Sequence, residues 1–439
     1  MEPPKPFDPD VPSHPDPEAP LSGPPEPWAF LPQPLRRDGP PWWMTEMIAA
    51  EPALAGRVLR RLGARLVASG APRVPAIPET PGRDTPAGRI AAAIRAALEA
   101  GEPVIVTGCG TSEHGAQAFA EIVAEAALRA RIRGSAHPGA VLARQAFEAA
   151  LSPQRGGVII GISHEGGTEA TLDALRAAAV RRARTVAVTV SAASPIGILA
   201  RDVAATGEID RSWCHTVGYL SPILAAAAVG AAITGVGRDA DPVAIRDLLS
   251  AGAGRGSIAG EAAAHVGATD ALAGALAGCR QLVVLASGVD RTAARELALK
   301  IEEATWLPAT MRDLETFLHG HIPATDESTA LLLVLVDRAG REARSSRASQ
   351  ALAAAGRVGV RAGAILAADL DREWPAFLAP AGRVLVPEAP QLPAPVAALV
   401  GTATPLQLLV ERMARARGTN PDPIRRDQLA YREAAALVE

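Results

Sequence analysis

The stretch Thr107-Gly-Cys-Gly-Thr-Ser112 decides the fold of this chain, because it joins the apolar run Val104-Ile-Val106 to a long helical pattern that begins at Gly115. A second junction of this kind follows about fifty residues later, where Val158-Ile-Ile160 leads into Gly161-Ile-Ser-His-Glu-Gly-Gly-Thr168 and a further helical pattern. A helix that begins directly after a strand points its first backbone N–H groups at one place, which favours an anion or a sugar hydroxyl. Two such loops predict a ligand site at the carboxyl ends of the strands of one sheet.

The composition limits the classes of protein to which the chain can belong. Its 439 residues are enough for two domains with separate cores, and with 48% apolar but only 3% aromatic residues the interior must consist mainly of Ala, Val and Leu. The net charge of −3 gives no electrostatic reason to expect a nucleic-acid or membrane partner. The three cysteines, Cys109, Cys214 and Cys279, show no paired spacing, and the N-terminus lacks the pattern of a signal peptide, so a cytoplasmic protein is expected.

The first 41 residues include fifteen prolines and almost no periodic apolar pattern, so this arm is expected to be extended or disordered. Apolar residues at helical spacing predict a helix from Thr45 to about Gly70 and a second from Pro86 to Ala100. The segment from Thr216 to Gly237 is uncharged and formally long enough to span a bilayer. Because Pro222 interrupts it and Ala and Gly dominate it, a buried helix is expected instead.

Strands and helices alternate through the rest of the chain. Strands are expected at 104–107, near 138–142, and at 157–162, 184–190, 281–286, 330–336, 358–367 and 383–387, and helices at 114–130, 144–151, 169–181, after Pro222, and at 291–306, 341–355 and 393–416. This alternation predicts an α/β fold of two tandem doubly wound domains with parallel sheets. Gly252 to Gly260 marks the seam. The expected division is a proline-rich arm (1–42), N-terminal helices (43–100), a first domain (101–250), a second domain (260–416) and a C-terminal tail over the active site (417–439).

Six motifs follow one another in an order that allows a comparison with a known family. They are Met44-Thr-Glu-Met-Ile-Ala-Ala-Glu-Pro52, Gly108-Cys-Gly-Thr-Ser112, Ser163-His-Glu-Gly-Gly-Thr168 with Thr171, Glu296-Leu-Ala-Leu-Lys-Ile-Glu-Glu303, Leu318-His319-Gly320 and Asn420-Pro-Asp422. Together they resemble the sugar isomerase (SIS) family, in particular the isomerase half of glucosamine-6-phosphate synthase and related amino-sugar phosphate isomerases and deaminases. The resemblance covers about residues 43–439 and implies two flavodoxin-like SIS domains.

The resemblance also implies the roles of two residues. Glu303 would move a proton between C1 and C2 of the open-chain sugar, and His319, sixteen residues later, would help to open the ring, often in the neighbouring subunit's site. The alternatives are a solvated or salt-bridged Glu303 and a His319 that only belongs to a turn. Glu296 and Lys300 lie one helical turn apart and can pair, a structural role that we favour over a catalytic one. The further residues expected to bind substrate are Cys109, Gly110, Thr111, Ser112, Ser163, His164, Glu165, Thr168, His215, Thr216, Lys300, His321, Tyr431 and Arg432.

Three departures from the family pattern point to a less anionic ligand. Glu165 replaces a serine that contacts phosphate in the family, and a carboxylate about 4 Å from a phosphate would cost on the order of 4 kcal/mol at an effective dielectric of 20. Either Glu165 turns away or the substrate is not held by a phosphate here. Cys214-His215-Thr216 takes the place of a Ser-Thr-Lys segment, which removes a positive charge. The tail has Tyr431 and Arg432 where the synthase has a lysine, which argues against an imine through this segment.

Nothing in the chain resembles a glutaminase domain, so amide transfer from glutamine is not expected. No cofactor is expected. Loop histidines and neighbouring acids could converge on a metal, but hydrogen bonds to sugar hydroxyls are favoured over a metal site; the residues concerned are His114, His164, His215, His319, His321, Cys214, Glu113 and Glu165.

Two functions from different classes remain open. The first is a sugar or amino-sugar (phosphate) aldose–ketose isomerase, with or without deamination or amination by free ammonia, that works as a homodimer with shared active sites. The second is a non-catalytic, sugar-binding regulatory SIS protein without a DNA-binding domain. The presence of both Glu303 and His319 favours catalysis, since a pure binder would not need the pair.

Overall fold

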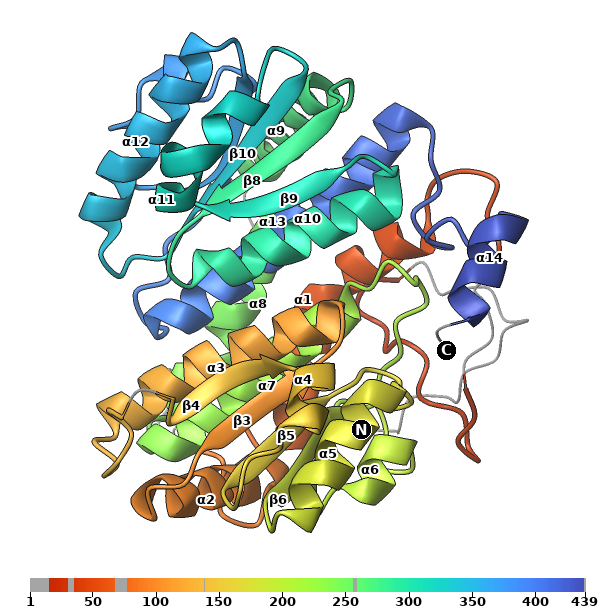
Figure 1. The fold of residues 1–439 in the computed structure, drawn as a ribbon, viewed down its shortest axis with the longest axis vertical. Helices are drawn as coiled ribbons and strands as arrows, with labels where there is room; N and C mark the ends of the chain where they lie inside the picture. Colours follow the sequence, from red (N-terminus) through yellow and green to blue (C-terminus); the bar gives the residue numbers. More distant parts are fainter. Residues whose placement is uncertain (1–15, 31–34, 68–76, 138, 256–258, 438–439) are drawn as a thin grey trace.

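The apolar runs of the sequence form two parallel sheets of five strands each (Figure 1). The structure is a computed structural model that describes residues 16–30, 35–67, 77–137, 139–255 and 259–437. The first sheet has the order β4-β3-β5-β6-β7 and consists of β3 (Val104–Gly108), β4 (Val141–Gln145), β5 (Val158–Ile162), β6 (Arg184–Thr189) and β7 (Asp202–Ala205). The second has the order β12-β11-β10-β8-β9 and consists of β8 (Gln281–Ala286), β9 (Ala309–Asp313), β10 (Thr329–Leu335), β11 (Arg361–Ala367) and β12 (Arg383–Val386).

Helices accompany both sheets. Before the first sheet come α1 (Trp43–Leu62), a short antiparallel pair β1 (Arg65–Val67) and β2 (Ile77–Glu79), and α2 (Pro86–Glu99). The first domain adds α3 (Thr111–Arg129), α4 (Ala146–Leu151), α5 (Glu169–Val180), α6 (Pro195–Leu199), α7 (Val217–Thr234) and α8 (Pro242–Gly252). The second adds α9 (Ala259–Leu276), α10 (Asp290–Thr305), α11 (Leu314–Thr316), α12 (Arg341–Arg357), α13 (Ala394–Arg417) and α14 (Leu429–Ala436).

Successive residues of the central strands face different apolar cores, which is why these strands are apolar throughout. In β5, Ile160 belongs to a large core that is continuous through both domains, whereas Ile159 belongs to a separate core with residues of α4 to α6. In β10, Leu332 belongs to the large core and Leu331 to a third core with α12. Each sheet is therefore covered on both faces. Helices α3 and α10, one from each domain, pack against each other between the sheets (Figure 1).

Helices α7 and α13 are long and apolar enough to cross a membrane. In each, however, 89% of the most apolar window is buried inside the protein. They pack against each other within the large core. Both are therefore core helices, as expected for 216–237, although α7 begins at Val217 and includes Pro222.

The expected parallel α/β fold is confirmed, with three differences in its elements. Helix α1 ends at Leu62 rather than near Gly70, because Gly63 at φ 103° ends it; residues 68–70 lie outside the described part. The strand expected near 138–142 lies at Val141–Gln145, residue 138 being outside the described part. The pair β1–β2, the edge strands β7 and β9, and helices α6, α8, α9, α11 and α14 were not expected, and α8 and α9 flank the predicted seam, of which 256–258 are not described.

The described parts of the proline-rich arm, 16–30 and 35–42, contain turns and bends but no helix. The arm lies against the first domain through buried polar contacts. Arg57 of α1 binds the backbone oxygens of Glu18 and Ala19 at 3.1 and 3.3 Å, and Glu208 accepts the backbone N–H of Leu21 at 3.1 Å. The described part of the arm is thus held by these two residues, and the expectation that the arm is extended or disordered stays a prediction.

Candidate active site

The first glycine-rich loop joins β3 to α3 in a tight turn. Gly110, at φ 56°, is the residue before the helix, which begins at Thr111, three residues earlier than expected. A side chain at Gly108 would meet the backbone oxygen of Ser112 at 2.5 Å, so this turn requires glycine. The N-terminus of α3 therefore points at the loop, as the sequence predicts.

Two side chains of this loop contact other elements. Cys109 Sγ lies 3.7 Å from Thr171 Oγ1 of α5, and burial raises the pKa of its thiol. Thr111 donates a hydrogen bond of 3.3 Å to Glu296 on α10. The loop is thereby connected to the second domain.

The second glycine-rich loop follows β5 and lies beneath the arm. Ser163 Oγ accepts the backbone N–H of Gly166 at 3.1 Å and lies 3.2 Å from Thr168 Oγ1. A side chain at Gly167 would meet the ring of Phe30 at 2.2 Å, so the arm crosses this loop at van der Waals contact. Thr168 is exposed, whereas Ser163 is buried.

A buried ionic network on α10 includes the predicted general base. Lys300 Nζ lies 2.5 Å from Glu303 Oε2 and 3.7 Å from Glu296 Oε1, and the Lys300 and Glu296 side chains are fully buried. Glu296 also lies 2.7 Å from Nδ1 of His114 on α3. Burial acts to raise the pKa of Glu296, but Lys300, His114 and Thr111 outweigh it and lower this pKa. The pairing expected for Glu296 and Lys300 is present, and Lys300 binds Glu303 more closely.

An aspartate and two histidines form a second cluster after β7. The backbone N–H of Asp210 donates to His164 Nε2 at 3.0 Å, and the rings of His164 and His215 lie 5.6 Å apart. His215 Nδ1 lies 3.8 Å from Asp210 Oδ2, an ion-pair distance rather than a hydrogen bond. Burial acts to lower the pKa of His215, but Asp210 outweighs it and raises this pKa above its ordinary value. His215 therefore supplies part of the positive charge that the sequence indicated was missing from the segment Cys214-His215-Thr216.

The two clusters are close enough to interact electrostatically. The charge of Lys300 acts to lower the pKa of His215, and that of Glu165 acts to raise it. Lys300 also acts to lower the pKa of Cys214. Burial raises the pKa of Cys214 well above its ordinary value, which keeps this thiol neutral. The structure therefore brings Glu165, His215, Lys300 and Glu303 into one region.

His319 and His321 lie elsewhere in the same chain. His319 follows β9, whose five residues span about 17 Å, at the end opposite to that where α10 ends (Figure 1). Its side chain is 73% exposed and lies 3.2 Å from Glu315. His321 accepts a hydrogen bond of 3.4 Å from Arg312. Within one protomer, the structure does not bring either histidine to Glu303.

The C-terminal tail contacts α1 and the histidine loop. The Asp422 carboxylate accepts the backbone N–H groups of Trp43 and Met44 at 2.8 and 2.9 Å, which satisfies the start of α1. Its backbone oxygen accepts the N–H of Trp213 at 3.0 Å. Burial raises the pKa of Asp422 to about 6 despite these donors.

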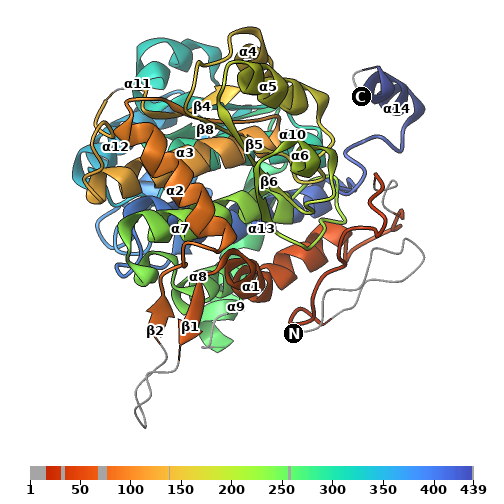
Figure 2. The same ribbon diagram turned by 90° about the horizontal axis from the view of Figure 1, so that it is seen from below.

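Farther along the tail, arginine and aromatic side chains stack beside the end of α10. The guanidinium of Arg425 lies 4.5 Å from the ring of Trp306 and 4.0 Å from that of Tyr431. Trp306 is the residue that ends α10, three positions after Glu303. Tyr431 and Arg432 lie on α14, which has no buried residue and stands apart from the domains (Figure 2).

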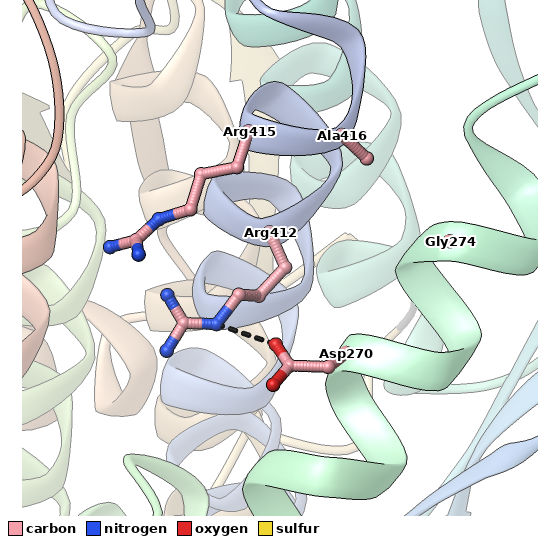
Figure 3. Close-up of a pocket in the computed structure, with 5 residues that line it drawn as sticks. All are labelled: Asp270, Gly274, Arg412, Arg415 and Ala416. Atoms are coloured by element: carbon pink, nitrogen blue, oxygen red, sulfur yellow. Dashed lines mark ion pairs between the residues drawn. The ribbon is translucent and has the colours of Figure 1, made fainter.

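A pocket of about 430 Å³ lies between α9 and α13 (Figure 3). It is lined by Asp270, Gly274, Arg412, Arg415 and Ala416, and Arg412 Nε lies 2.8 Å from Asp270 Oδ1 across it. None of these residues belongs to the clusters above. Among the described residues there is also no group of three or more His, Cys, Asp or Glu side chains that could hold a metal.

Asp210 belongs to no sequence motif, and no motif indicates the contact of His114 with Glu296. Asp210 lies in an irregular segment, and the other two residues are 182 positions apart in the chain. No periodicity or local spacing identifies such contacts. The tandem-sheet fold alone indicated that the loops would converge.

His164 is expected to make stability depend on pH. Burial and the charge of His215 lower its pKa to about 4, and its Nε2 must stay unprotonated to accept the Asp210 N–H. The unfolded state, with a pKa near 6.5, therefore binds more protons between pH 6.5 and 4, so stability is lost as pH falls through this range. The contribution of His164 to this loss is about 1.6 kcal/mol between pH 6.5 and 5, whereas Asp422, whose pKa is raised to about 6, gains stability as pH falls through the same range.

Urea denaturation of wild type and His164→Gln at these two pH values isolates the contribution of His164. In His164→Gln, whose side-chain oxygen can accept the same N–H without titrating, the loss should be smaller by most of that amount. An equal loss in wild type and variant would contradict the assignment to His164.

Comparisons with known proteins identify the fold. No family model matches the chain, and no curated protein matches it. The C-terminal domain of glucosamine-fructose-6-phosphate aminotransferase from Francisella tularensis has a TM-score of 0.68 at 15% identity, covering 88% of this chain and 100% of that one. Tagatose-6-phosphate ketose/aldose isomerase from Escherichia coli has a TM-score of 0.60 at 18% identity, covering 89% and 96%. Glucosamine-6-phosphate deaminase from Thermotoga maritima has a TM-score of 0.51 at 15% identity, covering 77% and 97%. At these identities the likeness establishes the fold.

Proposed function

We propose that this chain, which has the tandem SIS fold of solved sugar-phosphate isomerases, interconverts an aldose and a ketose by moving a proton between C1 and C2. The observation that supports this most is the ionic pair of Glu303 and Lys300, 2.5 Å apart, at the end of α10. A second candidate, in which an amino sugar is isomerised and free ammonia is released or taken up, is favoured by Glu165, because a carboxylate suits an amine.

Glu303 is well suited to act as the general base. Its side chain is 22% exposed, so it can reach a substrate, while its partner Lys300 is fully buried. The ammonium of Lys300, 2.5 Å away, fixes the position of the Glu303 carboxylate, which is the group that would accept the proton. Lys300, Glu296 and His114 then act as positioning residues, since they orient Glu303 through α10 and connect it to α3.

The test is proton–deuterium exchange followed by NMR in deuterated buffer. The panel contains fructose, glucosamine and tagatose, each with and without a 6-phosphate. Exchange at the carbon next to a carbonyl is expected for at least one member. If calorimetry shows that a panel sugar binds but no panel sugar exchanges, the regulatory sugar-binding protein is favoured instead.

We further propose a cytoplasmic homodimer in which His319 enters the partner's site. Support comes from the exposure of His319 and from α14, where Leu429 is 60% exposed and Leu437, the residue after the helix, is 87% exposed. If this is correct, a mixture of His319→Ala and Glu303→Ala chains recovers part of the activity, because one of the two sites in each mixed dimer is intact. Assays on purified mixed dimers measure the recovery, and none in verified mixed dimers would refute shared sites.

Glu165 is proposed to select against a phosphate at the second loop. Replacing it with serine removes a negative charge, so kcat/KM for a phosphorylated sugar relative to the free sugar is expected to rise at least about tenfold, equivalent to ~1.4 kcal/mol. Glu169→Ser is the control, because Glu169 begins α5 but is 63% exposed and paired with Arg176. An unchanged preference in Glu165→Ser would mean that Glu165 turns away from the ligand.

A further inference from the structure

Isomerisation requires a second group besides Glu303. When a C–H proton leaves the carbon next to a carbonyl, negative charge develops on the carbonyl oxygen, and a donor there lowers the barrier. The tail offers no lysine for this task, and Tyr431, at 43% exposure, stacks on Arg425. A histidine near Glu303 could supply the proton instead.

The Asp210 carboxylate is rigidly held and ionised. Oδ2 accepts the backbone N–H groups of Thr216 at 2.6 Å and Gly218 at 3.2 Å, and Oδ1 accepts that of Ser212 at 3.1 Å. Burial acts to raise the pKa of Asp210, but the charges of His215 and His164 and the N–H of Thr216 outweigh it and lower this pKa. A buried, fixed carboxylate of this kind attracts an adjacent imidazole electrostatically and favours its charged form.

His215 presents its other ring edge away from Asp210. Its Nδ1 is the atom nearest Asp210, so Nε2 lies on the opposite edge of the ring, and Nε2 has no hydrogen-bond partner within the described part of the chain. The side chain is 26% exposed. The charged groups that act on it are Asp210, Lys300 and Glu165, with His164 as its ring neighbour.

His164 is not an equivalent candidate. Its Nε2 is already the acceptor for the backbone N–H of Asp210, and the residue is 8% exposed. Gly218 allows the two rings to approach, because a side chain there would meet His215 Cβ at 3.2 Å and His164 Cγ at 3.5 Å. His164 therefore positions Asp210, and His215 is the more exposed histidine of the cluster.

We propose that His215, held by Asp210, is the general acid that donates its Nε2 proton to the carbonyl oxygen of the open-chain sugar while Glu303 removes the neighbouring C–H proton. The C–H electron pair becomes the C=C bond of an enediol, and the carbonyl π pair moves to the oxygen that receives the proton. In the second half, Nε2 takes a proton from the adjacent hydroxyl while Glu303 returns its proton to the other carbon. This inference rests on the proposed isomerase function.

The test compares wild type with His215→Asn on the panel sugar that exchanges fastest. We expect kcat to fall about 10²- to 10⁴-fold with little change in KM, and the ionisation that belongs to His215 to disappear from the pH profile of kcat. His265→Asn is the matched control, because His265 lies on α9 and binds the backbone oxygen of Gly252. Imidazole added to His215→Ala should restore part of the lost rate.

A second measurement does not depend on turnover. NMR titration of the His215 ring should give a pKa above 6.5 in wild type that falls in Asp210→Asn, with circular dichroism to verify the fold. A His215→Asn enzyme that keeps more than a third of kcat and an unchanged pH profile would overturn the role of His215 and leave the isomerase intact. No exchange in wild type with any panel sugar would overturn the isomerase, and this role with it.

Discussion

Replacing Glu303 with glutamine is expected to reduce the exchange rate about 10³-fold or more, because an amide of the same shape cannot accept a proton from carbon. The fold should survive the change. Lys300 keeps the carboxylate of Glu296 at 3.7 Å, so its buried charge remains compensated. The loss should therefore appear in kcat, while KM, which reflects binding of the sugar, changes little.

The neighbouring Glu302 provides the control. It lies on the same helix, is exposed, and accepts the backbone N–H of Ala309 at 3.2 Å rather than binding Lys300. Glu302→Gln should keep exchange within about threefold of wild type, since surface substitutions away from special features usually have small effects. If Glu303→Gln retained a tenth or more of the wild-type rate, Glu303 would not be the base.

The parts of the fold that could be predicted from the sequence are those where burial on both faces makes a strand continuously apolar. Strands β5, β8 and β10 were expected at nearly their observed positions for this reason. The edge strand β7 (Asp-Val-Ala-Ala) has only four residues, and β9 (Ala-Thr-Met-Arg-Asp) includes three polar ones, so no long apolar run marks either strand. An edge strand has one neighbour, and its existence depends on that pairing rather than on its own residues.

The contacts of the candidate site also differ in how well the sequence predicts them. The pairing of Lys300 with acids three and four positions away on one helix is a local consequence of helical spacing. The ion pair of His215 with Asp210 depends instead on an irregular loop whose path is set by backbone hydrogen bonds to Asp210. Because the family's lysine is absent from this loop, the sequence indicated that a positive charge is missing. The structure instead places His215 beside Asp210, which raises the pKa of the histidine.

Lys300→Met is expected to cost about 3–5 kcal/mol of the free energy of unfolding. The substitution keeps much of the side-chain volume but leaves the fully buried carboxylate of Glu296 without its ammonium, and an uncompensated buried charge is costly. Urea denaturation of wild type and variant measures the difference. The surface group of Arg176 with Glu169 and Asp173 is the control, since Arg176 is 50% exposed and solvent screens its pairs, so Arg176→Met should cost at most ~1 kcal/mol.

A double variant separates the charge from the packing. If the cost of Lys300→Met comes from the stranded carboxylate, adding Glu296→Gln should recover more than half of it, because the glutamine is neutral and can still accept from Thr111. If the cost came from packing alone, the second substitution would recover nothing. A loss below 1 kcal/mol in Lys300→Met would instead mean that water or protonation already offsets the cost of the buried Glu296 charge. Lys300, Glu296 and His114 could not then fix the position of Glu303.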